Sequence, residues 1–178
     1  MKKKGFTLVE LMVVIVIMGI LVTIGTFAFQ SSQKKSRDSR RKSDLNQVTK
    51  ALEMYNTDVG VYPAGGTVGT VDAGKIIGCV NASGTTVTCS WGSGFTNALK
   101  SVVYMVKLPK DPNSSQTYYY ERIGNGYRLY GRLENAEDAA IPTTGSFAYG
   151  QNCGTTANIM YCNYVITSPN VVEPTPKP

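Results

Sequence analysis

The residues that could do chemistry in this 178-residue chain fall into three groups. Glu10 is an isolated acid in an apolar stretch, cysteines stand at four positions, and a short acidic segment spans 134–138. The chain contains no histidine, which excludes histidine-bound zinc sites, Ser-His-Asp and Cys-His nucleophiles and imidazole acid-base catalysis. The composition therefore predicts that the protein is not an enzyme.

The cysteines form an even set, Cys79, Cys89, Cys153 and Cys162, which suits an oxidising compartment. Three pairings are open. We favour the local one, Cys79 with Cys89 and Cys153 with Cys162, which closes two loops of about ten residues. A zinc site made of all four thiolates is the alternative, but neither pair has the short spacing of a zinc knuckle. Reduced, buried cysteines are the remaining option.

The stretch around Glu10 reads as a membrane segment. No charge occurs from Leu11 to Gln33, and a helix of that length covers roughly 35 Å, enough to span a bilayer. Lys2, Lys3 and Lys4 precede it, so this part of the net charge of +6 points to a membrane rather than to nucleic acid. A cleaved secretory signal peptide and a stop-transfer anchor are the alternatives, but the run is long for a signal peptide and contains an acid.

A cationic segment, 34–42, comes next, and we expect a solvated helix face or contact with anionic headgroups there, with the acidic flank of a neighbouring subunit as the alternative. The helix is predicted to continue to about Asp58 and to dock on a core, because an apolar stripe follows at helical spacing. The stripe consists of Leu45, Val48, Leu52, Tyr55 and Val59. Gly60 and Pro63 end it. Two heptads are too few to support a coiled coil instead.

The remainder reads as β structure with glycine-rich loops. Segments 118–123 and 127–133 flank Gly124-Asn125-Gly126, a hairpin pattern, and 161–167 is a third strand candidate. We expect a short helix within 96–106. The tyrosines at 118–120, 127 and 130 are expected to be sheet residues, with an aromatic adhesive or electron-conducting surface as the alternative.

The N-terminal sequence Lys2-Lys3-Lys4-Gly5-Phe6-Thr7-Leu8-Val9-Glu10 resembles the class III signal of type IV prepilins and type II secretion pseudopilins. The resemblance implies cleavage after Gly5, methylation of the new Phe6 amine, and pairing of Glu10 with that amine on a neighbouring subunit. Segments 44–63, 108–112 and 118–133 are similar to the head of major pseudopilins. Many relatives carry a proline late in the apolar segment, and this chain does not.

Major pseudopilins carry a calcium-binding loop just after the hairpin, and here Glu134, Glu137 and Asp138 occupy that region. Calcium takes about six to eight oxygen ligands, so Asn135 and backbone carbonyls would have to complete such a site. The acid- and glycine-rich pattern of the family is not reproduced, and a solvated loop is the simpler interpretation. No other cofactor is predicted.

These observations predict an α+β, pilin-like fold, in which a long N-terminal helix with an apolar transmembrane half packs on a small antiparallel β-sheet head. The predicted division is a leader at 1–5, a transmembrane and filament-core helix at 6–33, its amphipathic continuation at 34–59, a β-rich head at 60–167 and a disordered, proline-rich tail at 168–178.

The resemblance implies a structural subunit that polymerises through this helix into a type IV pilus-like extracellular filament. A type II secretion pseudopilin is the alternative, and a membrane-tethered, non-polymerising DNA- or surface-binding module is the alternative of another class. Implied partners are copies of the chain, minor pilins, a prepilin peptidase, an inner-membrane assembly platform and the membrane itself. Nucleic acid is a possible partner but is not implied. The precursor is expected in the inner membrane with its N-terminus in the cytoplasm, and the mature subunit in a cell-surface or periplasmic filament.

Overall fold

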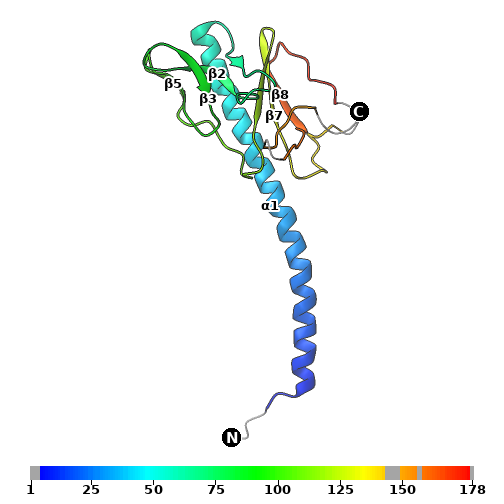
Figure 1. The fold of residues 1–178 in the computed structure, drawn as a ribbon. Coiled ribbons are helices and arrows are strands. Elements are labelled where there is room, and N and C mark those ends of the chain that lie inside the picture. Colours follow the sequence, from blue (N-terminus) through cyan, green and yellow to red (C-terminus); the bar gives the residue numbers. More distant parts are fainter. Residues whose placement is uncertain (1–4, 143–148, 156–157, 177–178) are drawn as a thin grey trace.

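The computed structural model describes residues 5–142, 149–155 and 158–176, and a single long helix carries a small β-rich head in this part of the chain (Figure 1). Helix α1 extends over Leu8–Val59. The strands that follow are β1 (Ala64–Gly65), β2 (Ile76–Val80), β3 (Thr86–Cys89), β4 (Phe95–Asn97), β5 (Val102–Met105), β6 (Tyr119–Ile123), β7 (Gly126–Gly131) and β8 (Tyr164–Thr167). The predicted α+β, pilin-like architecture is confirmed.

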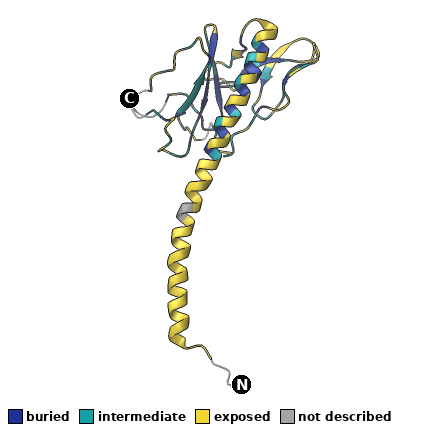
Figure 2. Ribbon diagram, turned by 180° about the vertical axis from the view of Figure 1, so that it is seen from behind, coloured by how far each residue is buried: buried dark blue, intermediate teal, exposed yellow. Residues whose placement is uncertain are grey.

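The strands form two small sheets that pack on the C-terminal half of α1 (Figures 1 and 2). The first sheet has the order β1-β2-β4-β5, with β3 paired to β2, and the second has the order β6-β7-β8. The described ladders are antiparallel except for the single bridge between β2 and β4. The predicted hairpin and the predicted third strand are both confirmed as the second sheet.

The apolar stripe of α1 is the part of the helix that enters the core. Leu45, Val48 and Leu52 are completely buried and Tyr55 nearly so, as their spacing predicts. Val59 stays exposed because the helix ends there: the N–H of Gly60 donates to the Asn56 carbonyl at 2.8 Å, and Gly60 takes a φ of +84°. Glycine adopts this left-handed backbone without a steric penalty.

The prediction of a short helix within 96–106 is wrong, because this segment forms β4, a turn and β5. Phe95 and Tyr104 from these strands lie against Tyr55 of α1, with ring centroids 5.4 and 5.2 Å from it. The β-branched residues Val102 and Val103 suit a strand. Burial of the aromatic rings against α1 therefore requires the extended backbone.

The C-terminal segment differs from the expected disordered tail over its first residues. Ser168 is buried, and its side-chain oxygen accepts from the Tyr127 N–H at 3.1 Å. Further on, the Tyr149 hydroxyl donates to Glu173 at 2.8 Å, and the Val172 carbonyl accepts from Arg128 at 3.0 Å. Local composition could not indicate these contacts because their partners lie on distant parts of the head. Residues 177 and 178 lie outside the described chain.

Truncation of the core stripe tests this packing. Leu52→Ala in the detergent-solubilised full chain should lower the free energy of unfolding of the head by about 2–5 kcal/mol, because it leaves a cavity under both sheets. Urea titration monitored by the fluorescence of Trp91, the only tryptophan, measures the change. Met54→Ala, two residues away on the exposed face, is the control and should change it by less than about 1 kcal/mol. Equal losses in the two variants would contradict the docking described.

Candidate assembly site

The residues predicted for processing lie in a short segment without regular secondary structure that precedes α1. Gly5 has no heavy atom within 4 Å of the position that a Cβ would take, and Phe6 is 84% exposed. The peptide bond between them is therefore accessible in the single chain. Whether it is the cleavage point stays a prediction.

Glu10 takes part in a capping box at the start of α1. Its carboxylate accepts from the backbone N–H and from the hydroxyl of Thr7, both at 2.8 Å, while its own N–H donates to the Thr7 hydroxyl at 3.3 Å. This arrangement satisfies N–H groups that a helix start would otherwise leave unpaired. The sequence interpretation assigned Glu10 only an intermolecular partner, although the Thr-x-x-Glu pattern was already a sign of this second role.

The N-terminal half of α1 has no cover from the head. Every large apolar side chain described from Leu8 to Ile24 is at least 45% exposed. Figure 2 shows this half of the helix extending away from the head, with its described residues coloured as exposed. Within the described residues, α1 is the one helix that is long and apolar enough to cross a membrane. Such a surface is not stable in water and requires lipid or other protein around it.

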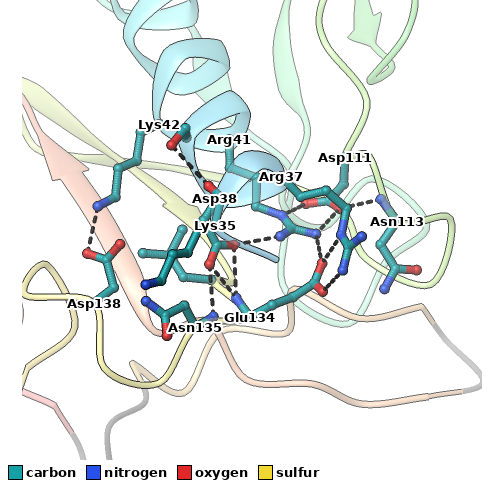
Figure 3. A network of polar contacts seen from close by, with 12 residues as sticks. Lys35, Arg37, Asp38, Arg41, Lys42, Asp111, Asn113, Glu134, Asn135 and Asp138 are labelled. Atoms are coloured by element: carbon teal, nitrogen blue, oxygen red, sulfur yellow. Dashed lines mark hydrogen bonds and ion pairs between the residues drawn. The ribbon is translucent and has the colours of Figure 1, made fainter. Parts of the chain in front are cut away.

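Where α1 meets the head, five charged residues form a basal ion cluster: Arg37, Asp38, Arg41, Asp111 and Glu134 (Figure 3). The fully buried Arg41 guanidinium donates to both oxygens of Asp111 at 2.8 Å, to Asp38 at 2.7 Å and to Glu134 at 2.7 Å. Arg37 also binds Glu134. The cluster therefore ties α1 to two loops of the head.

Backbone groups complete this cluster. The Asp38 carboxylate accepts from the N–H groups of Glu134 and Asn135 at 2.9 and 2.8 Å, and Asp111 accepts from the Asn113 N–H at 2.8 Å. A buried charge is tolerated only when it is paired and hydrogen-bonded in this way. Because these contacts are directional, the cluster restricts how the two loops can be oriented on the helix.

The hydrogen bonds of the cluster stabilise the ionised forms of Glu134 and Arg41. The hydrogen bond from Arg37, together with that from Arg41, lowers the pKa of Glu134 to about 2. Burial alone would lower the pKa of Arg41, but its hydrogen bonds to Asp111 and Glu134 outweigh this effect and raise it. Both groups are charged throughout the physiological pH range.

The expected solvated face or headgroup contact over 34–42 is wrong for four of its seven charged residues, which form ion pairs with one another or with the head: Arg37, Asp38, Arg41 and Lys42. Arg41 and Asp38 are buried, and Lys42 donates to Asp138 at 2.6 Å. Asp111 and Glu134 were not recognised as partners because they lie 70 and 93 positions from Arg41 in the sequence. Lys34 and Lys35 are exposed, as expected.

The three calcium candidates are not gathered into a site. Glu134 and Asp138 bind cationic side chains of α1, and Glu137 is exposed. Within the described chain, no group of three or more histidine, cysteine or acidic residues is placed to hold a metal ion. The acidic segment contacts α1 instead.

The structure forms the two disulfides of the favoured local pairing, Cys79–Cys89 and Cys153–Cys162. The first joins β2 to β3, and the second closes the loop that precedes β8. Both therefore restrain irregular parts of the head, and no cysteine in the described residues is free.

The tyrosines of β6 and β7, and Tyr118 directly before β6, point into the head rather than out of it. Tyr118, Tyr120, Tyr127 and Tyr130 are almost completely buried, which contradicts an adhesive or conducting surface built from them.

Several tyrosine hydroxyls of the head bind carboxylates of α1: Tyr118 binds Asp44, Tyr62 and Tyr127 bind Glu53, and Tyr104 binds Asp58. These hydrogen bonds add a polar layer to the docking of the helix.

Known proteins share this N-terminal pattern and much of the chain. Residues 1–26 match a family model described as the prokaryotic N-terminal methylation motif. Fimbrial protein EcpC of Eikenella corrodens is 31% identical over 147 residues, which make up 79% of this chain and 95% of that protein. The chain belongs to the type IV pilin and pseudopilin family. Family membership implies assembly with copies of itself and with other pilin-type subunits.

The pseudopilin side of the family is also similar over a shorter region. Type II secretion system core protein G of Escherichia coli K12 and that of Vibrio cholerae are each 39% identical over 62 residues, or 35% of this chain. The aligned region spans 43% and 42% of those two proteins, less than half of either. No solved structure matches the chain.

Removal of the central cation should destabilise the junction between helix and head. Arg41→Gln leaves the carboxylates of Asp38 and Asp111 buried without their main partner, so the free energy of unfolding should fall by about 3–5 kcal/mol. Arg40→Gln is the matched control, because the Arg40 side chain is 69% exposed and lies 3.9 Å from Asp44, and it should cost at most about 1 kcal/mol. Equal losses in urea titrations of the two full-length variants would contradict the assigned role of Arg41.

Acid should release the same junction through Glu134. Its pKa is lower in the folded chain, about 2 against 4.5, so its contribution to stability is fully present above pH 4.5 and is lost as the pH falls toward 2. Glu134→Gln removes this titration. The stability of the variant should therefore decline less between pH 5 and 2 than that of the wild type, as measured by urea titration at each pH. Parallel declines would show that Glu134 does not carry the effect.

Proposed function

We propose that this chain is a pilin that polymerises into a type IV pilus-like extracellular filament through the N-terminal half of α1. The observation that carries the proposal is the uncovered apolar half of a helix whose other half is fixed in a folded head. In a filament, neighbouring copies of that half would bury one another. The similarity to a fimbrial protein covers 95% of that protein's length, so it includes the head as well as the N-terminal motif. This supports the assignment as a pilin.

Processing would create the partner that Glu10 lacks within its own helix. Cleavage after Gly5 by a prepilin peptidase would leave Phe6 with a free, then methylated, amine. No basic residue lies between Phe6 and Gln33, so the new amine at Phe6 is the cation that processing supplies, and the resemblance to prepilins assigns Glu10 the amine of a neighbouring subunit. Attraction between the two charges is strengthened where the surroundings are apolar, and the pair would set the axial register.

The capping box suggests how Glu10 is accommodated before assembly. In the single subunit its carboxylate is satisfied by the Thr7 N–H and hydroxyl. A carboxylate can accept further hydrogen bonds, so the amine of a neighbour could be added while the cap is kept. The same residue would therefore begin the helix and bind the next copy.

The remaining steps follow the family. The precursor would lie in the inner membrane as a single-pass protein with a cytoplasmic N-terminus, and an assembly platform would extract it into a filament together with minor pilins. The role is structural rather than catalytic, and no cofactor is needed. A periplasmic pseudopilus is the second candidate, supported by the 39% identity to core protein G.

The variant Glu10→Gln tests the proposed function. Glutamine can also complete a capping box, so the substitution removes the charge while the helix start is retained. Membrane levels and cleavage should be normal, because a neutral amide is easier to bury than a carboxylate. Few or no filaments should form when the variant is the sole copy. Counts of sheared filaments, an immunoblot of the membrane fraction and N-terminal sequencing of the mature chain measure these outcomes.

Glu137→Gln is the control for this experiment, since it removes an exposed acid of the head and should leave the filament count unchanged. Wild-type filament yield from Glu10→Gln would mean that apolar packing alone sets the register. Two results together would favour the pseudopilus: the wild-type strain makes no surface filaments, and a strain from which the chain is deleted fails to secrete folded proteins.

A further inference from the structure

The structure divides the cationic segment 34–42 into two sets. Arg37, Arg41 and Lys42 are held by acids of the head. Lys34 and Lys35 are exposed, and no carboxylate of the described chain lies within 4.0 Å of their ammonium groups. Two cations just below the head therefore have no acidic partner among the described residues.

The height of these lysines along α1 matches the edge of a bilayer. The helix is continuous from Leu8, and at about 1.5 Å per residue Lys34 lies roughly 39 Å above that residue. A bilayer with its headgroup regions is about 40–45 Å thick. When the apolar half of α1 spans the membrane, Lys34 and Lys35 therefore lie at the level of the lipid headgroups in the leaflet nearest the β-rich head of the protein.

The head begins directly above this level. Arg37, the first residue of α1 that binds the head, is three positions beyond Lys34, a rise of only about 5 Å. The uncharged residues 30–33 separate the lysines from the apolar half. Long lysine side chains can keep an ammonium group in the headgroup layer while their methylene stems lie along apolar surface.

We infer that Lys34 and Lys35 bind anionic phospholipid headgroups in the unassembled subunit and thereby fix the depth of α1 and the height of the head above the bilayer. The two side chains leave the helix about 100° apart, so they can reach different lipids. This inference goes beyond the proposed function, because it concerns the anchored subunit before any filament forms. It depends on membrane insertion and not on polymerisation.

Lysine labelling in vesicles tests the inference without any substitution. The full-length precursor is reconstituted in phosphatidylcholine vesicles with or without 30% phosphatidylglycerol, and modification by a membrane-impermeant amine reagent is followed by mass spectrometry of each lysine. Lys34 and Lys35 should react roughly fivefold more slowly in the anionic vesicles at low salt, since a lysine near such a surface gains about 1 kcal/mol. Raising the salt to about 0.5 M should remove most of the protection.

Lys50 is the internal control. It is exposed and lies roughly 24 Å farther along α1, well beyond the screening length of about 10 Å at 0.1 M salt, so its labelling should be the same in both vesicles. Equal labelling of Lys34 and Lys35 in both vesicles would overturn the inference. Equal protection by inorganic phosphate added to the phosphatidylcholine vesicles would also overturn it, because it would assign the lysines to any phosphate rather than to a lipid surface.

A matched pair of variants separates these lysines from the general charge of the chain. After mild detergent extraction from the mixed vesicles, the double variant Lys34→Gln, Lys35→Gln should retain clearly less phosphatidylglycerol relative to phosphatidylcholine than the wild type, because the leader lysines 2–4 then supply most of the remaining attraction. The wild type and Arg40→Gln, which removes a single cation about 9 Å farther along the helix, should both be enriched in phosphatidylglycerol. Enrichment in the double variant equal to that of the wild type would contradict the inference.

Discussion

The constraint on which the whole molecule depends is that half of one continuous helix is apolar on every side. A helix satisfies its own backbone hydrogen bonds, so this half can lie in lipid or among other helices without rearrangement. It cannot remain in water, because its apolar side chains have no cover from the head. The capping box formed by Thr7 and Glu10 lies at the start of this helix. After Glu10, the next charged residue is Lys34, which lies beyond the apolar half.

The other half of α1 is fixed in the head by three kinds of interaction. The apolar stripe around Leu52 contributes most of the driving force by burial, but apolar contacts alone specify orientation weakly. The basal ion cluster around Arg41 adds directional contacts to two separate loops, and a second layer of tyrosine hydroxyls binds acids of the helix. A rigid connection of this kind would transmit the position of the helix in an assembly to the outer surface of the head.

Features with a local sequence pattern were predictable, whereas features made by distant residues were not. The helix, the hairpin at Gly124 and the short-range disulfides depend on spacing over a few residues, and they were predicted. The partners of Arg41 lie 70 and 93 positions away, and no local pattern indicates that a cation in a charged run will be buried. The segment 96–106 was misjudged for the same reason, since its strands are selected by contacts with Tyr55.

The most direct test of this account is a cryo-electron microscopy reconstruction of filaments sheared from cells that express the chain. The account predicts that the N-terminal halves of α1 form the filament core, that the heads keep the contact between Arg41 and Asp111, and that each Glu10 carboxylate lies within about 4 Å of the Phe6 nitrogen of a neighbouring copy, where the attraction between the charges is strong. A filament whose apolar helices lie on the outside, or in which Glu10 faces no amine, would contradict it.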